Sequence, residues 1–369
     1  MKTTSFVTLL FFIFIFSNIS GLPRFALQQK DKCISCHINP TGGVMRNENG
    51  FYFGKNVVSM SSPRDKDLIL SPKLTENISL GFDYRSQFIY SQEKDRADFQ
   101  DMTGSIYLNA SISRSIDVLA RYDFINSIWE AYGVARILPN DSYIKVGSFV
   151  PYFGIRIDDH TSYTKGGDFG LLFSIGTLQG LIYNPLYTEA GIELGANISD
   201  WGLITASVGK SKFNASLTTD PTFTSRLEVN SSIDKMNYFL GGSFASTKVR
   251  AAGKRLNTIL YGGFVGFGTQ DFSLMGEYDV ANDLLAQDIK SNAMMIEASY
   301  LLTVGLEAIL RYDKFDPNKD IENDELAHLV FGFEFFPYTF IELRPQYRIN
   351  LEEPSRNNNA FVLQFHFWY

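Results

Sequence analysis

Residues 340–350 read Phe340-Ile341-Glu342-Leu343-Arg344-Pro345-Gln346-Tyr347-Arg348-Ile349-Asn350. Successive side chains of an extended strand point to opposite faces, so this stretch would form one apolar row and one polar row. The apolar row consists of Ile341, Leu343, Tyr347 and Ile349. The polar row carries both signs of charge and consists of Glu342, Arg344, Gln346 and Arg348. The stretch therefore predicts a β-strand with one apolar and one charged face.

The same alternation recurs from about residue 77 to the end of the chain, in segments of about ten residues separated by turns. Both ends of an outer-membrane barrel lie in the periplasm, so its strand number must be even. We expect short turns on the periplasmic side and long loops, such as 91–101, 282–290 and 316–325, outside. The sixteen predicted strands are 77–90, 102–113, 116–124, 128–138, 142–149, 188–199, 200–210, 221–231, 236–246, 256–268, 271–281, 291–302, 304–315, 326–337, 339–351 and 359–369.

Two features favour a membrane barrel over a soluble β-sandwich with a buried apolar face. Many consecutive strands carry mixed charge on the polar face, which suits a water-filled lumen. The last residues place Phe361, Leu363, Phe365, Phe367 and Tyr369 on one face. This resembles the C-terminal signal strand of bacterial outer-membrane barrels. We predict an all-β fold, a transmembrane antiparallel β-barrel of about 16 strands at residues 72–369, in the bacterial outer membrane.

The longest predicted insertion, residues 150–187, follows the fifth strand. Its order along the chain matches the third outer loop of trimeric porins, which folds into the lumen and narrows it. We therefore expect the same of this insertion. It carries the charged run Arg156-Ile157-Asp158-Asp159-His160.

The N-terminus reads as a secretory signal peptide at residues 1–21. Lys2 precedes an apolar run from Phe6 to Phe16, and small or polar residues follow it. The run is too short for a spanning helix, which needs about 20 apolar residues. The formal net charge of −7 argues against a nucleic-acid partner.

Residues 33–37 read Cys33-Ile34-Ser35-Cys36-His37, the C-x-x-C-H attachment motif of a c-type haem. They include the only two cysteines among 369 residues. Two thiols at this spacing can bond the haem vinyl groups, and the adjacent histidine can ligate the iron. We predict one covalent haem c on Cys33 and Cys36, with His37 as the proximal ligand.

A cysteine pair has three other typical roles: a small disulfide, half of a zinc site, or a thioredoxin-like redox pair. Zinc would need two further ligands nearby, and this neighbourhood offers none. A thioredoxin-like motif opens a helix within a βαβ unit, a pattern not seen here. These comparisons favour haem.

The haem motif lies in a short segment, residues 22–71, which we interpret as a monohaem cytochrome c segment. Domains below about 40 residues usually need a covalent cross-link, a bound metal or a cofactor to fold stably, because they cannot bury enough apolar surface alone. A covalent haem would supply such a cross-link, and the inner face of the barrel would supply further surface for the segment to pack against. We expect the segment to plug the lumen; the alternative is a tethered periplasmic domain.

The second axial position of the iron has three candidate ligands. Met45 and Met60 lie nearby in the sequence, and His160 could reach the haem from the in-folded insertion. Methionine ligation would raise the reduction potential relative to two histidines. Spacing alone does not choose among the three, and the position can also stay open.

The order of signal peptide, one C-x-x-C-H motif and a porin-like barrel resembles the fused outer-membrane cytochrome–porin family. Members of that family in iron-oxidising bacteria pass electrons from extracellular ferrous iron through a single haem into the periplasm. The run from Cys36 to Gly43 also resembles that of other monohaem outer-membrane proteins. The resemblance implies an extracellular donor or acceptor such as a metal ion, and a periplasmic electron carrier.

Two other functions fit the sequence. The first is a diffusion porin in which the haem segment is a plug or redox sensor, because the predicted lumen carries mixed charge. The second is peroxidase or oxygen-binding chemistry, which needs an open iron position. For electron transfer, acidic residues in loops 91–101 and 316–325 could concentrate metal cations, although such runs are usually solvated.

Overall fold

A computed structural model of the chain describes most of the sequence. The described residues are 24–29, 31–43, 45–63, 70–92, 95–157, 161–167, 180–183, 187–211, 221–251, 254–351 and 357–369. The predicted signal peptide at 1–21 and the candidate ligand His160 lie outside these ranges.

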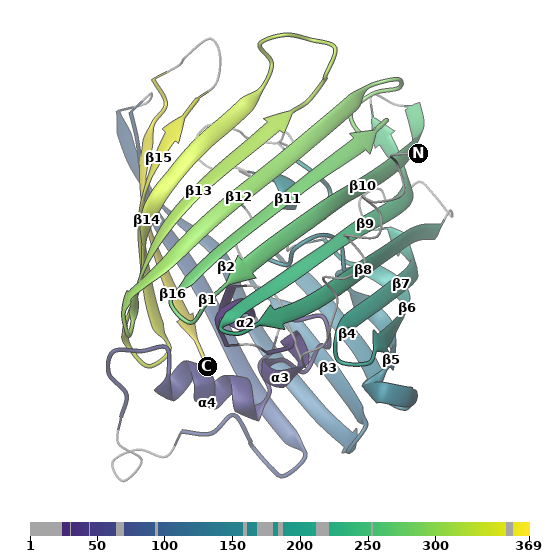
Figure 1. Ribbon diagram of the computed structural model, residues 1–369, viewed down its shortest axis with the longest axis vertical. Helices are drawn as coiled ribbons and strands as arrows, with labels where there is room; N and C mark the ends of the chain where they lie inside the picture. Colours follow the sequence, from purple (N-terminus) through teal and green to yellow (C-terminus); the bar gives the residue numbers. More distant parts are fainter. Residues whose placement is uncertain are drawn as a thin grey trace, which may run out of the picture.

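The described residues form one closed antiparallel barrel of sixteen strands, as predicted (Figure 1). Each strand pairs with its sequence neighbours, and β1 pairs with β16 to close the ring, from Asp83 opposite Trp368 to Ser91 opposite Ala360. The strands are β1 (Ile78–Ser91), β2 (Arg96–Ser113), β3 (Ile116–Asp123), β4 (Ile128–Ala135), β5 (Tyr143–Phe149), β6 (Glu189–Ile198), β7 (Gly202–Ser211), β8 (Pro221–Ile233), β9 (Met236–Ala251), β10 (Lys254–Gly268), β11 (Phe272–Asn282), β12 (Lys290–Thr303), β13 (Leu306–Asp316), β14 (Leu326–Tyr338), β15 (Ile341–Asn350) and β16 (Ala360–Trp368).

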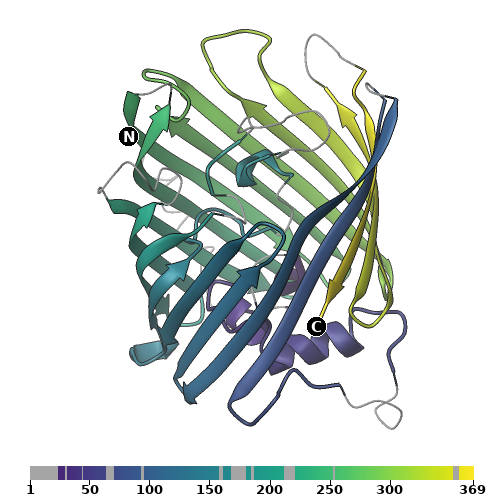
Figure 2. The ribbon, with the colours of Figure 1, turned by 180° about the vertical axis from the view of Figure 1, so that it is seen from behind.

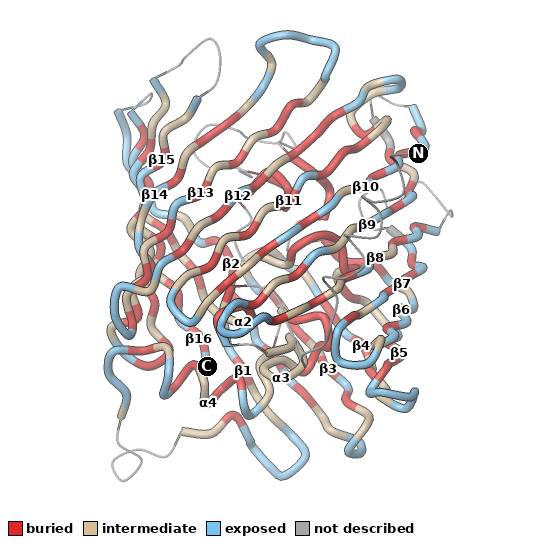
Figure 3. The backbone as a smooth tube through the Cα atoms, viewed as in Figure 1, coloured by how far each residue is buried: buried red, intermediate tan, exposed pale blue. Residues whose placement is uncertain are grey.

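Burial along the strands is inverted relative to a soluble sheet, and Figure 3 shows the alternation. Apolar side chains on the outer face are exposed, for example Val146, Ile192 and Leu310. Charged side chains on the inner face are buried, such as Arg311 and Glu342. An apolar outside and a charged inside suit lipid around the barrel and a polar lumen within it.

The connections differ between the two ends of the barrel. Short turns such as 114–115 and 304–305 lie at the end that carries the C-terminus, called the short-turn end below. The predicted outer loop 91–101 is wrong, because β2 already begins at Arg96 and pairs with β1. Phe99 lies opposite Phe88 with ring centroids 5.2 Å apart, so packing across the hairpin extends both strands.

The insertion after β5 folds into the lumen, as expected, and its described residues are called the inward loop below (Figure 2). Its short 3-10 helix η2 (Tyr163–Lys165) contacts β11, β12 and β13. The backbone N–H of Ile155 donates to Glu277 at 3.1 Å, and Lys165 Nζ lies 2.7 Å from the same carboxylate. Arg226 Nε donates to the carbonyl of Gly154 at 2.8 Å. The loop is thus bonded to β8 and β11 of the barrel wall.

Three short helices precede the barrel: α2 (Arg24–Gln29), α3 (Cys33–Cys36) and α4 (Glu48–Asn56). None of the described helices is long and apolar enough to cross a membrane. α2 lies inside the barrel against β9, β10 and β11, while α4 lies across the short-turn end (Figures 1 and 2). The described residues between 24 and 60 are called the plug below.

Candidate functional site: a cavity at the C-x-x-C-H turn

The C-x-x-C-H residues form a single helical turn. The N–H of His37 donates to the carbonyl of Cys33 at 2.9 Å, which closes the turn. Asn47 holds this turn against α4: its side-chain oxygen accepts from the N–H of Gly50 at 2.9 Å and caps the helix. Its amide nitrogen donates to the carbonyls of Ile34 at 2.9 Å and Ser35 at 3.1 Å. One side chain therefore fixes the motif and the next helix together.

A tight turn after the motif brings the chain back over Cys33. Gly42 and Gly43 adopt φ of 77° and 70°, which favours glycine over residues with a Cβ. Asn39 stabilises the turn, because its amide donates to the carbonyl of Gly42 at 2.8 Å. A Cβ on Gly42 would lie 3.2 Å from Cys33 Sγ, so the turn lies directly against the thiol.

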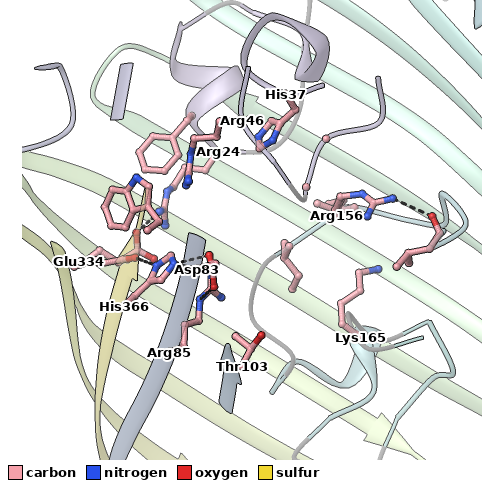
Figure 4. Close-up of a pocket in the computed structure, with 18 of the residues that line it drawn as sticks. Arg24, His37, Arg46, Asp83, Arg85, Thr103, Arg156, Lys165, Glu334 and His366 are labelled. Carbon is pink, nitrogen blue, oxygen red and sulfur yellow. Dashed lines mark hydrogen bonds and ion pairs between the residues drawn. The ribbon is translucent and has the colours of Figure 1, made fainter. Parts of the chain in front are cut away.

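A central cavity of about 320 Å³ lies between the plug, the inward loop and the barrel wall. His37 lines it, and Figure 4 shows that Arg46, Asp83, Arg156 and His366 lie around the same space. Its apolar lining comes from both the plug and the strands: Phe25, Phe53, Val58, Ile309, Val330, Phe336 and Trp368. The cavity is thus walled by the plug, the inward loop and strands β1–β4 and β11–β16.

The two thiols are not joined by a disulfide bond. Burial raises the pKa of Cys33 to about 12, and the Glu228 carboxylate adds to the shift. Burial also raises the pKa of Cys36, with Asp31 contributing. Both groups are therefore thiols at neutral pH, which is unlike the lowered pKa of a thioredoxin-type nucleophile. Within the described ranges, no three His, Cys, Asp or Glu side chains gather as a metal site.

The residues around the motif fit a covalent haem. Two thiols flank one helical turn, and the imidazole that follows lines a cavity with apolar walls. The thiols do not line this cavity, and Cys33 lines a smaller neighbouring pocket with Pro40 and Tyr143. Gly42 and Gly43 line the same cavity as the imidazole, and a Cβ on either would lie against Cys33 or Arg156. When bound there, a haem would supply a one-electron redox centre, held through Cys33, Cys36 and His37.

Neither of the two described candidates for the second axial ligand lines this cavity. Met45 is buried in an apolar cluster with Ile38 and Tyr107. Met60 is 48% exposed and its N–H donates to the carbonyl of Phe336 at the short-turn end. Neither lines the cavity, so the second ligand remains a prediction.

Two lining residues with iron-ligating atoms did not emerge as ligand candidates from the sequence. Met275 on β11 is buried and faces inward. His366 on β16 also lines the cavity, but its ring nitrogens lie 2.7 Å from Glu342 and 2.9 Å from Asp83. The inward phase of these strands could have indicated both, whereas their distance from His37 depends on the closed barrel.

The lumen wall carries apolar patches where Leu27 and Phe51 of the plug touch it. Leu27 packs with Phe239, Phe264 and Met295, and Phe51 of α4 packs with Phe340 and Trp368. A lumen filled with water would be lined by polar side chains at these positions. Burial of each apolar side chain of this size stabilises the docked plug by about 1.5–3 kcal/mol relative to leaving the side chain exposed. The patches therefore indicate a built-in docking surface for the plug.

Arg24 joins the plug to three strands. Its guanidinium pairs with Glu334 of β14, with Glu307 of β13 at 3.3 Å and with Glu297 of β12 at 3.9 Å. Burial alone would lower the pKa of Arg24, but the carboxylates of Glu307, Glu334 and Glu297 outweigh it and hold the pKa above its ordinary value. Gln28 adds a hydrogen bond to Glu307 at 2.8 Å.

Comparison with known proteins gives a fold and no family. No protein-family profile matches the sequence, and no curated protein matches it. Among solved structures, OprB of Pseudomonas putida aligns with a TM-score of 0.60 at 10% identity, covering 86% of this chain and 100% of that chain. The outer membrane channel DcaP of Acinetobacter baumannii aligns with a TM-score of 0.57 at 12% identity, covering 81% and 100%. OmpF of Salmonella typhi, solved with daunomycin, aligns with a TM-score of 0.52 at 10% identity, covering 79% and 98%. The chain therefore has the sixteen-stranded barrel fold of bacterial outer-membrane channels.

Proposed function

We propose that this protein is a porin-type channel of the bacterial outer membrane whose periplasmic mouth is closed by a plug that carries one covalent haem c. The observation that carries the proposal is the match between apolar patches on the lumen wall and the apolar side chains of the plug. A plug and an inward loop that meet in one lumen leave a narrow path for solutes. The plug would therefore restrict diffusion, and its haem would stabilise it or sense redox state.

Haem attachment is tested on the full chain expressed in a host competent in cytochrome maturation. We expect the mature protein to gain the mass of one haem and to show a Soret band. The variant with both Cys33→Ser and Cys36→Ser should insert as a folded barrel and lack both signals. Wild-type protein without the added mass, isolated from outer membranes of the same host, would refute haem attachment and leave a plugged barrel.

Electron transfer across the membrane is the second candidate function. His37 lines a cavity that lies between the plug and the inward loop, so a small donor that entered the lumen could approach this position. The chain's own residues would hold the cofactor, shield it from lipid and set the charge around it. The candidate donors include extracellular metal ions, and the acceptor would be a periplasmic electron carrier.

The two candidates differ in one measurement on proteoliposomes that carry the haem-loaded protein. Ferrous iron added outside should give reduced haem within the mixing time if the protein transfers electrons from iron. Dithionite serves as the control that the haem can be reduced. If dithionite reduces the haem and ferrous iron does not, iron is not the donor. A conductance that differs between the oxidised and reduced protein would then favour the redox-sensing plug.

A further inference from the structure

The central cavity is lined by more basic than acidic side chains, eight against five. Four further carboxylates, those of Asp123, Glu277, Glu307 and Asp313, pair with these cations from behind the lining. The basic lining residues are Arg24, Arg46, Arg85, Arg121, Arg156, Lys165, Arg311 and Arg344. In a partly enclosed space, a cation that no carboxylate pairs with favours an anionic ligand.

Most of these cations already have a carboxylate partner. Six of the eight form ion pairs with acidic side chains of the barrel wall: Arg24, Arg85, Arg121, Lys165, Arg311 and Arg344. Arg46 stacks on Trp368, with its guanidinium carbon 5.2 Å from the ring centroid. Arg156 is the remaining cation, and it forms no ion pair with any described carboxylate.

Arg156 makes two long hydrogen bonds, and its guanidinium carbon lies 5.5 Å from the centroid of the Tyr152 ring. One terminal nitrogen lies 3.4 Å from Thr41 Oγ1 and 3.4 Å from the carbonyl of Val150. Its Nε is buried and donates to no acceptor. Its carbon chain lies over the glycine turn, because a Cβ on Gly43 would be 3.0 Å from Arg156 Cδ. The inward loop thus presents this side chain to the plug beside the cavity (Figure 4).

We propose that Arg156 binds a carboxylate in the central cavity. A planar guanidinium matches a carboxylate through two parallel N–H···O bonds, and Arg156 is a partly buried cation that pairs with no described carboxylate. The carboxylate has two sources of the same chemistry: a propionate of a haem attached at Cys33 and Cys36, or a carboxylate solute that enters the lumen. The site itself does not depend on the haem.

The test compares Arg156→Gln, Arg156→Lys and the control Arg136→Gln in the full haem-loaded protein. Arg136 also joins the plug to the wall, since it pairs with Asp117 at 2.7 Å and donates to the carbonyl of Ile38 at 2.9 Å. It does not line the central cavity. Heat-dependent mobility in detergent gels checks that each barrel is folded. Succinate binding by titration calorimetry and the haem midpoint potential between pH 5 and pH 8 are the two readouts.

A solute site predicts that wild-type protein binds succinate and that Arg156→Gln weakens binding by about tenfold or more, with Arg156→Lys between them. A propionate site predicts no succinate binding, together with a lower and more pH-dependent midpoint potential in Arg156→Gln. The potential falls because removal of the cation favours the more positive oxidised haem. The proposal is overturned if Arg156→Gln matches Arg136→Gln in both readouts.

Discussion

Replacement of Arg24 by glutamine is expected to release the plug and to raise the single-channel conductance of the barrel in planar bilayers. The guanidinium faces Glu297, Glu307 and Glu334, so its removal leaves three buried carboxylates without their shared cation. Breaking a buried ion pair from one side costs about 3–5 kcal/mol. That cost raises the equilibrium ratio of released to docked plug by roughly two to three and a half powers of ten.

The matched control is Lys73→Gln, which removes a cation from a surface pair. Lys73 Nζ lies 2.5 Å from Glu48 of α4, but the two side chains are 43% and 50% exposed. Exposed pairs contribute less than about 1 kcal/mol, so conductance should stay at the wild-type value. A second variant, Arg24→Gln with Glu334→Gln, should recover part of the closed state. Equal conductance in wild type and Arg24→Gln would contradict the role of Arg24 in holding the plug.

The barrel could be predicted because each strand carries its own local signal. Ile341 is apolar and its neighbour Glu342 is charged, so the two side chains suit opposite faces of a strand. The same alternation repeats in every segment. The sixteen predicted segments correspond one to one with the sixteen strands of the structure. Register within hairpins was harder to predict. Phe99 continues the alternation of β2 into a region rich in Asp, and the acidic residues there suggested a loop.

The candidate site could be predicted only in part. Cys33, Cys36 and His37 follow from one short motif, which requires no knowledge of the fold. Arg24, Met275 and His366 line the same cavity, yet they come from α2, β11 and β16. These residues come together only because the barrel closes and the plug enters the lumen to a certain depth. No local sequence pattern predicts either of these features. Arg156 stood out only as part of a charged run, and only the structure shows that no described carboxylate pairs with it.

Replacement of Gly50 by alanine is expected to abolish the docking of α4 on the C-x-x-C-H turn and with it most haem incorporation. A Cβ on Gly50 would lie 2.1 Å from the carbonyl oxygen of Cys36 and 2.8 Å from its carbon. Both are backbone atoms of the motif, so no side-chain rotation relieves the overlap. Overpacking of this kind costs typically about 1–3 kcal/mol, and more where backbone must move. Haem content per barrel and protease cleavage within residues 24–60 measure the effect.

Gly54→Ala in the same helix separates steric overlap from helix propensity. Glycine within a helix costs about 0.5–1 kcal/mol relative to alanine, so both variants gain equally from propensity. A Cβ on Gly54 would meet only the indole nitrogen of Trp368, at 3.1 Å, and this side chain can shift by a few tenths of an ångström. Gly54→Ala should therefore keep wild-type haem content and protease resistance. If Gly50→Ala behaves in the same way, α4 does not lie against Cys36, and the cavity described around His37 would be built differently, because the position of the motif depends on that contact.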